Sequence, residues 1–597
     1  MTENNNDDRS LIETLVYEGV LPSFDLPTDV ALFEAQKIGK TFGKIVAEHS
    51  VSKSLSSALN TWTPNRKLVI EKTEYKISGI LIPFAEIPEN DDSLTPSQQD
   101  ERKALAKKDR FEWWLRKPGN LKYIHVCTSC RHVLSSDSSP SELDDNEKAI
   151  LEGEKSCPIC NSIVDDSTFV SLPWIQPPGY GPAMDASGRH PDPKSQGGTP
   201  STRSGLGERT IWPMQYSNDD STTLIPFSNG VIVSSSDEVS RLRQMVAKDI
   251  VPEDPDPDVS VLETTGFSIC ESCGSFNPRG SHPRPYPFSK TLYNDDTVNF
   301  TPDTIKSCSG ISTHLVLGRS FSSTILSLRI PLGGILIDPI AQADQRSFRN
   351  LQKAAFTLGR VLIDELCQFN SFNIDEFDCD VRLYRKPGGD TEHDRFLEVF
   401  FFENTSGGSG NLFHINESMV ELLNGQFSAL ETSIEDRLSG NKCLIMVPNE
   451  GNNGKYSASA HPCNKACNGC LLDYRNSNFE HRLDRELAWH LWRFVRHDSL
   501  NVDDGSILNL EQYLIKIKNY IENKPSTQHL DITPNKVNDK IISVNITDRE
   551  NNIQEIVKIR SPLLNDDDDD DEVMTFSSDQ VRFDLEDVMD EIIDAFD

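Results

Sequence analysis

The sequence has little positive charge. Lys and Arg number 59 against 93 Asp and Glu in 597 residues, which gives a formal net charge of −34 at pH 7. Phosphate binding is supplied by Lys and Arg, so this balance excludes a protein whose whole surface grips DNA. Any contact with nucleic acid must come from a local basic surface or from a partner.

Long apolar runs are also missing. The most apolar run, residues 325–340, contains Arg329 and two glycines and is too short and broken to span a bilayer. Residues 1–10 are polar and acidic and lack the features of a signal peptide. We therefore expect a cytoplasmic protein whose 13 cysteines stay reduced, so that CxxC pairs favour metal over disulfides.

The motifs of several enzyme classes are absent from the sequence. It has no GxxxxGK[ST] loop, no DExH or DEAD box after a strand, and no HxK pair of the phospholipase D type. Residues 404–411 form a Gly-rich turn that could cradle phosphate. Because this turn lacks the Lys-Ser/Thr ending of a P-loop, tight turning is the favoured interpretation. These absences predict a chain that is not an enzyme.

Two CxxC pairs, Cys127/Cys130 and Cys157/Cys160, predict a zinc site in the first third of the chain. Paired CxxC turns separated by a loop are typical of a zinc ribbon. The preceding segment is the most basic of the chain and is interleaved with tryptophan. It either contacts single-stranded nucleic acid or is a solvated face with tryptophan anchors, and both interpretations stay open for Lys107, Lys108, Arg110, Trp113, Trp114, Arg116 and Lys117.

A second pattern, HxCx3CxxC, comprises His461, Cys463, Cys467 and Cys470. Four thiolate or imidazole ligands within ten residues match the tetrahedral set that zinc prefers. Cys367, Cys379 and Cys443 fall on expected core elements and are most simply buried thiols.

A third group consists of Cys270, Cys273 and Cys308, with His314 as a candidate fourth ligand. The alternative is a knuckle that has lost its metal and packs as ordinary core. The cofactor predicted for the whole chain is therefore Zn²⁺, with two sites and a possible third.

The run from Cys463 to Asn476, Cx3CxxCLLxYxN, and the Leu-Asp-Arg that ends at Arg485 resemble the zinc-binding C-terminal domain of MrfA-type helicases. They also resemble DrmB, the helicase-associated subunit of the DISARM phage-defence system. The resemblance covers residues 260–490 well and the first 100 residues faintly. It departs from the usual CxCx3CxxC at His461. It implies a zinc-binding subunit that acts on phage DNA together with a DrmA-like, ATP-driven helicase.

The expected architecture is multidomain α/β (α+β), with a separate zinc-ribbon-like module and a mixed-sheet core that carries a zinc knuckle. Residues 11–60 are expected to be mainly helical, and spacings of three and four predict a long helix over residues 346–369. The expected regions are 1–100 (helices and strands), 101–170 (four-cysteine module), 171–260 (Pro/Gly-rich linker and short elements), 261–320 (second Cys cluster), 321–500 (α/β core with zinc knuckle), 501–565 (extension) and 566–597 (disordered acidic tail with an amphipathic helix).

The function expected from these observations is that of a non-catalytic zinc subunit associated with a superfamily 2 helicase in DISARM-like defence. A metal-dependent nuclease or phosphodiesterase and a stand-alone DNA-binding adaptor remain as alternatives. In the acidic tail, the apolar stripe of residues 583–596 is a candidate for docking into a basic groove.

Overall fold

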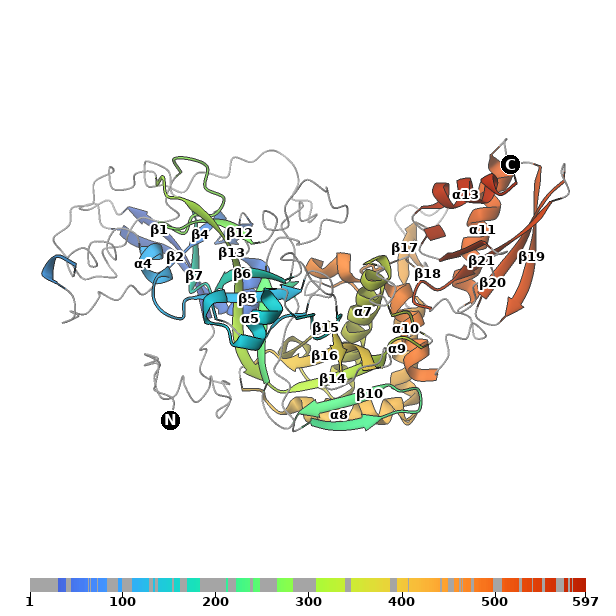
Figure 1. Ribbon diagram of the computed structural model, residues 1–597, viewed down its shortest axis with the longest axis horizontal. Helices are drawn as coiled ribbons and strands as arrows, with labels where there is room; N and C mark the ends of the chain where they lie inside the picture. The colour runs from blue at the N-terminus through green and yellow to red at the C-terminus, as the bar shows by residue number, and fades with distance from the viewer. Residues whose placement is uncertain are drawn as a thin grey trace. The chain divides into compact units, whose positions relative to one another are not determined.

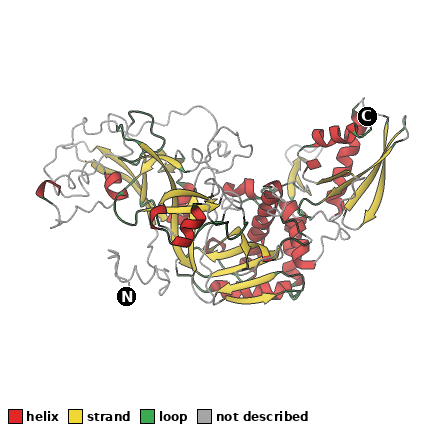
Figure 2. Cartoon of the chain, viewed as in Figure 1, coloured by secondary structure: helices red, strands yellow, loops and turns green. Residues whose placement is uncertain are grey.

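The computed structural model divides the chain into two compact units. The first unit comprises residues 1–218, 239–323 and 404–409, and the second comprises residues 219–238, 324–403 and 410–597. Figure 1 labels the elements, and Figure 2 colours them by type. The structure describes residues 30–38, 45–62, 64, 66–71, 73–82, 95–98, 110–127, 132–134, 138–152, 155–161, 169–182, 211–212, 222–236, 240–246, 266–282, 308–334, 336–338, 345–386, 394–405, 407–440, 443–448, 456–460, 463, 465–473, 477–497, 507–524, 529–538, 541–549, 553–564, 574–577, 580–581 and 584–596.

One sheet of the first unit has five strands in the order β2-β1-β7-β4-β3. Alternate residues of β1, Ala31, Phe33 and Ala35, are buried, as the period of two in a strand requires. The expectation of a mainly helical segment is therefore wrong for residues 30–38 and 45–54. The elements are β1 (Val30–Ile38), β2 (Ile45–Ser54), α2 (Leu55–Thr61), β3 (Lys67–Ile70), β4 (Thr73–Ile80) and β7 (Gly179–Pro182).

The other sheet of the first unit has the order β5-β6-β13-β11-β8, and β12 pairs with β13. It is mixed, because β13 runs parallel to β6 and antiparallel to β11. Part of the segment expected to be a linker forms β6, β7 and β8, and Trp174 and Tyr180 are completely buried there. The elements are α4 (Arg110–Leu115), β5 (Leu121–Cys127), η1 (Pro140–Glu142), α5 (Asp145–Leu151), β6 (Phe169–Ile175), β8 (Ile211–Trp212), β11 (Ser240–Val246), β12 (Phe267–Cys270) and β13 (Ser312–Ser323).

The core of the second unit is a five-stranded sheet in the order β15-β16-β14-β10-β9, antiparallel throughout. The predicted long helix is confirmed as α7, which packs against β15 and β16. Two of its residues, Leu351 and Leu358, are completely buried. The elements are β9 (Thr222–Pro226), β10 (Ile232–Ser236), β14 (Ile325–Pro331), α7 (Gln345–Phe369), η4 (Ile374–Glu376), β15 (Phe377–Arg385), β16 (Arg395–Glu403), α8 (Asn411–Leu423), α9 (Ser428–Ser439), β17 (Leu444–Pro448), β18 (Tyr456–Ala460), η6 (Ser477–Arg482) and α10 (Arg485–His497).

The last part of the second unit is a four-stranded sheet, β19-β20-β21-β22, whose apolar residues share a core with α11 and α13. The amphipathic helix expected in the acidic tail is confirmed as α13. Its apolar residues Val588, Met589 and Ile592 are buried in this core. The tail is therefore ordered over α13, and this apolar face is not free for another groove. The elements are α11 (Ile507–Asn523), β19 (Leu530–Asn538), β20 (Ile541–Asp548), β21 (Gln554–Arg560), β22 (Met574–Ser577) and α13 (Leu585–Asp594).

The multidomain α/β architecture expected from the sequence is confirmed, but the core sheet of the second unit is antiparallel and not mixed as expected. Among the described residues, no helix combines the length and the apolar character that crossing a membrane requires.

Candidate metal centres

In the first unit, the strand β12 leads directly into a CxxC turn. Cys270 is its last residue, and the N–H of Gly274 donates to the Cys270 carbonyl at 2.8 Å. Gly274 has a φ of 73°, in the left-handed region that glycine adopts without strain. A Cβ at this position would lie 3.1 Å from the ring of Phe111. The glycine therefore allows both the sharp turn and the close approach of α4.

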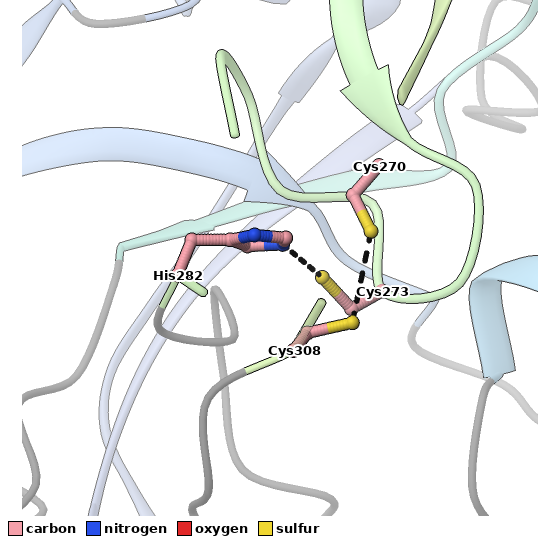
Figure 3. A group of neighbouring side chains, drawn as sticks. All are labelled: Cys270, Cys273, His282 and Cys308. Carbon is pink, nitrogen blue, oxygen red and sulfur yellow. Dashed lines mark hydrogen bonds between the residues drawn. The ribbon is translucent and has the colours of Figure 1, made fainter. Parts of the chain in front are cut away.

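The structure brings Cys270, Cys273 and Cys308 together and adds His282 to them (Figure 3). The Cys270 and Cys308 sulfur atoms are 3.7 Å apart, and Cys273 Sγ lies 3.4 Å from His282 Nε2. Two backbone hydrogen bonds of 2.9 and 2.7 Å join His282 and Cys308. All four residues are buried. We call this group the Cys270 cluster.

The protonation of His282 suits a metal ligand. Its Nδ1 lies 3.0 Å from the carbonyl oxygen of Gly280, which can only accept a hydrogen bond. The proton is thereby placed on Nδ1, and the Nε2 lone pair is left facing the sulfur atoms. Metal-bound histidines are usually oriented by such a second hydrogen bond.

The electrostatics of the Cys270 cluster also favour a bound cation. The pKa of the Cys270 thiol is lowered to about 4, chiefly because Cys273 donates a hydrogen bond to it. The pKa of Cys273 is raised by that same hydrogen bond and by burial. Ionisation of one thiol therefore disfavours ionisation of the next. Several buried thiolates thus require a cation to offset their charge. Gly310 leaves room for the sulfur, since a Cβ there would lie 2.8 Å from Cys270 Sγ.

His314, the candidate fourth ligand, does not belong to this group. It lies on β13 opposite Ser268, and its side chain is exposed. The expected ligand role is corrected in favour of His282, which the β-bridge to Cys308 brings into place.

In the second unit, Cys443, Cys463, Cys467 and Cys470 form another group, which we call the Cys443 cluster. The Cys443 and Cys467 sulfur atoms are 3.1 Å apart, and those of Cys463 and Cys470 are 3.4 Å apart. Backbone N–H groups of Cys463 and Gly469 donate to sulfur at 3.4 and 3.3 Å. Such bonds stabilise thiolates around a metal.

The pKa values of the Cys443 cluster follow the same pattern as those of the Cys270 cluster. The pKa of Cys463 is lowered to about 5, first by a hydrogen bond from Cys470 and further by the positive charge of Arg485. The pKa of Cys443 is raised to about 11, chiefly by burial.

Cys443 is buried, as expected, but it is not isolated, because the β17–β18 hairpin brings it to the knuckle. Leu444 pairs with Ala460, so Cys443, which precedes β17, comes close to Cys463, which follows β18. Cys443 completes a set of four described thiols. His461, which was expected in this set, lies outside the described residues.

Two arginines fasten the Cys443 cluster to the helices of the second unit. Arg485, almost fully buried, donates two hydrogen bonds to the carbonyl of Cys463, at 3.2 and 2.7 Å, and one to that of Leu438, at 2.6 Å. Arg437 donates to the Cys470 carbonyl at 3.3 Å and forms an ion pair with Asp364 of α7. A buried guanidinium with these partners fixes the knuckle backbone against α7, α9 and α10.

The remaining predicted set lies around Cys127. The sulfur atoms of Cys127 and Cys160 are 3.8 Å apart, and Cys157 completes a buried group of three. Asn161 has a φ of 55°, and its backbone N–H donates to the Cys157 carbonyl at 2.9 Å. Cys130 lies outside the described residues. We call this group the Cys127 cluster.

In its described part, the basic segment before the Cys127 cluster packs against the core of the first unit. Phe111 is completely buried, and Trp114 packs against the same core. Arg116 forms an ion pair with Glu112, and the Lys117 ammonium lies 6.0 Å from the centre of the Trp113 ring. Lys107 and Lys108 lie outside the described residues, and Arg110 begins α4. Trp114 is thus an anchor, whereas Arg116 is exposed.

The Gly-rich turn ends at the N-terminus of α8, where a carboxylate already binds. Glu403, completely buried, accepts a hydrogen bond of 2.9 Å from the N–H of Leu412. Gly410 precedes the helix with a φ of 81°. The structure therefore favours tight turning over phosphate binding at this position.

One group of acidic residues and a histidine remains, comprising Glu431, Glu435 and His497. Arg496 forms an ion pair with Glu431, with Nε 2.6 Å from Oε1, so a cationic side chain already neutralises this carboxylate.

Comparison with known proteins gives two similarities. No protein-family model matches the chain. The chain is similar to Druantia protein DruE of Escherichia coli (strain UMEA 4076-1), with 23% identity over 500 residues that cover 81% of this chain and 22% of DruE. It is also similar to the crystal structure of DUF1998 helicase MrfA bound to DNA, with 8% identity, a TM-score of 0.28 and coverage of 79% of this chain and 34% of that chain.

These similarities correct one expectation and narrow another. The expectation that the chain is not an enzyme is contradicted by the similarity of the chain to DruE. The expected resemblance to DrmB in particular is not shown by the similarity to DruE. The chain spans less than a quarter of DruE and about a third of MrfA.

Proposed function

We propose that the chain is a zinc-stabilised module of a helicase-type enzyme system that acts on DNA in anti-phage defence. The observation that carries this proposal is the match to DruE, which covers 81% of this chain. The resemblance of residues 463–485 to the zinc-binding domain of MrfA-type helicases supports the same class.

Zinc serves structure in this proposal. The Cys270 and Cys443 clusters each offer four protein ligands, and a structural zinc site is closed in this way. A catalytic zinc keeps one position open for water. The four-ligand sets therefore disfavour a metal-dependent nuclease or phosphodiesterase that uses these two sites.

The proposed partner is an ATP-driven helicase polypeptide of the DrmA type, as in a DISARM-like system. The match to DruE favours a second candidate, in which the chain works in a Druantia-like system. In both cases the complex is the enzyme, and the net charge of −34 makes DNA binding through the complex more favourable than binding by this chain alone.

A phage-protection assay tests the proposal. Cells that carry the complete system are compared with cells in which Cys270→Ala or Cys463→Ala has been introduced. Cys367→Ala is the matched control, since Cys367 is buried and lies outside the three clusters. We expect both cluster variants to lose protection and to lower the DNA-stimulated ATPase of the purified complex. Full protection by both variants, or recovery of the chain without any helicase, would refute the proposal.

A further inference from the structure

Exposed aromatic side chains lie in the second unit and are not part of the Cys443 cluster. Phe413 and Phe369 are 59% and 47% exposed, whereas large apolar side chains of this core are mostly buried. Phe369 ends α7, Phe413 lies in the first turn of α8, and Phe427 precedes α9. We call Phe369, Phe372, Phe413, His414 and Phe427 the aromatic patch.

The aromatic patch consists of two sets of rings at the neighbouring ends of α7, α8 and α9, and Phe372 and Phe427 are partly buried. The rings of Phe369 and Phe427 are 4.7 Å apart between centroids, and His414 lies 6.3 Å from Phe372 and 6.1 Å from Phe413. A hydrogen bond of 3.1 Å from Ser418 Oγ to Asn370 Oδ1 joins α8 to the end of α7. Contiguous exposed apolar surfaces of this kind mark interaction sites.

The backbone at the end of α7 is held in a strained form that places Phe372 in the patch. Ser371 has a φ of 59°, a conformation that glycine usually supplies at this position. The N–H of Phe372 donates to the Cys367 carbonyl at 2.8 Å, which closes the helix end. The turn directs the chain toward α8, where Phe372 meets His414.

The charge around the aromatic patch indicates the charge of the partner that would bind there. Residues 369–376 and 411–427 contain four acidic residues, Asp375, Glu376, Glu417 and Glu421, and neither Lys nor Arg. Glu417 is 58% exposed, and Glu421 is also exposed one turn further along α8. Arg496 approaches at Gly425 and is bound by Glu431. Phosphates are repelled by such a rim, and cationic side chains are attracted.

We propose that the aromatic patch with its acidic rim is the docking surface for a basic protein segment that carries apolar anchors. Aromatic residues dominate the energy of protein interfaces, and Arg and Lys at the rim meet the four carboxylates. The choice of the helicase polypeptide as the carrier of this segment rests on the proposed function.

Binding of the purified helicase subunit to the purified full-length chain tests this surface. The double variant Phe369→Ala/Phe413→Ala is expected to weaken binding at least about tenfold. The variant Glu417→Lys/Glu421→Lys is expected to weaken binding and to flatten its dependence on salt.

Two matched controls come from the same unit. Ile515→Ala removes an apolar side chain that is 55% exposed on α11, and Glu586→Lys/Asp590→Lys reverses an exposed i,i+4 acidic pair on α13. Both controls should bind as the unmodified chain does. If the unmodified chain binds the helicase and the patch variants bind equally well, the docking surface is refuted and the proposed function stands. If the unmodified chain does not bind the helicase, both are refuted. If the lysine variant binds the helicase unchanged and only binds a single-stranded oligonucleotide more tightly, the docking surface is also refuted.

Discussion

Replacing His282 with alanine is expected to remove one zinc ion and to destabilise the first unit. Cys270 and Cys308 approach to 3.7 Å across 38 positions of the chain, and His282 holds Cys308 through two backbone hydrogen bonds. A crosslink across this span lowers the entropy of the unfolded chain, and the relation for disulfides gives about 4 kcal/mol. For a unit of this size the loss corresponds to a fall in Tm of roughly 6 °C.

The assay pairs elemental analysis of zinc with calorimetry of the full-length chain, both after dialysis against a mild chelator. His314→Ala is the control, because it removes an exposed histidine on β13 that is no part of the Cys270 cluster. We expect His282→Ala to hold one zinc fewer than the unmodified chain and His314→Ala to hold the same number. If the His282 variant keeps its full zinc content and Tm while the His314 variant loses zinc, the assignment of ligands is refuted.

The remaining predictions concern the second unit. Cys443→Ala should lower the zinc content by one ion and His461→Ala should leave it unchanged, and the reverse outcome in elemental analysis would restore His461 as the ligand. His490 is buried, and burial lowers its pKa to about 4 from an ordinary value of 6.5. Between these two pKa values, His490 is protonated in the unfolded chain but not in the folded chain. About 3 kcal/mol of stability should therefore be lost as the pH falls from 7 to 4. Urea unfolding of His490→Gln should show a smaller loss, and an unchanged pH slope would refute this cause. Met589→Ala, in the buried face of α13, should cost about 2–5 kcal/mol in urea unfolding, and a neutral effect would show that α13 is not docked.

Local patterns of the sequence predicted much of the grouping of the cysteines. The CxxC pairs at Cys270 and Cys157 and the Cys463–Cys470 run are short, so the chain itself brings their sulfur atoms together. The missing ligands come from pairing between distant segments. His282 enters through its β-bridge to Cys308, and Cys443 enters through the β17–β18 register. The one available signal was the position of Cys443 on an expected core element shortly before the Cys463–Cys470 run.

The fold shows the same division between local and distant information. The helix at 345–369 follows from its own apolar spacing, which leaves one stripe buried. The strands β6 and β7 lie in a Pro- and Gly-rich segment, and only their partners stabilise them. Gly179 is an example, because a Cβ there would lie 2.6 Å from the carbonyl oxygen of Leu32 on β1. Gly179, which the composition of its segment predicts to be a linker residue, is thus needed for the close pairing of β7 with β1.

The three cysteine clusters compensate for a modest apolar content. Hydrophobic residues make up 36% of the chain, and like charges repel one another throughout an acidic protein. Within the Cys127, Cys270 and Cys443 clusters, sulfur atoms meet across 33, 38 and 24 positions. Each bound zinc would close a loop of that length and neutralise thiolate charge at the same time. Since two clusters lie in the first unit and one in the second, bound zinc would give each unit its own crosslinks. Metal binding can therefore stabilise each unit independently of the surface by which the chain meets its partner.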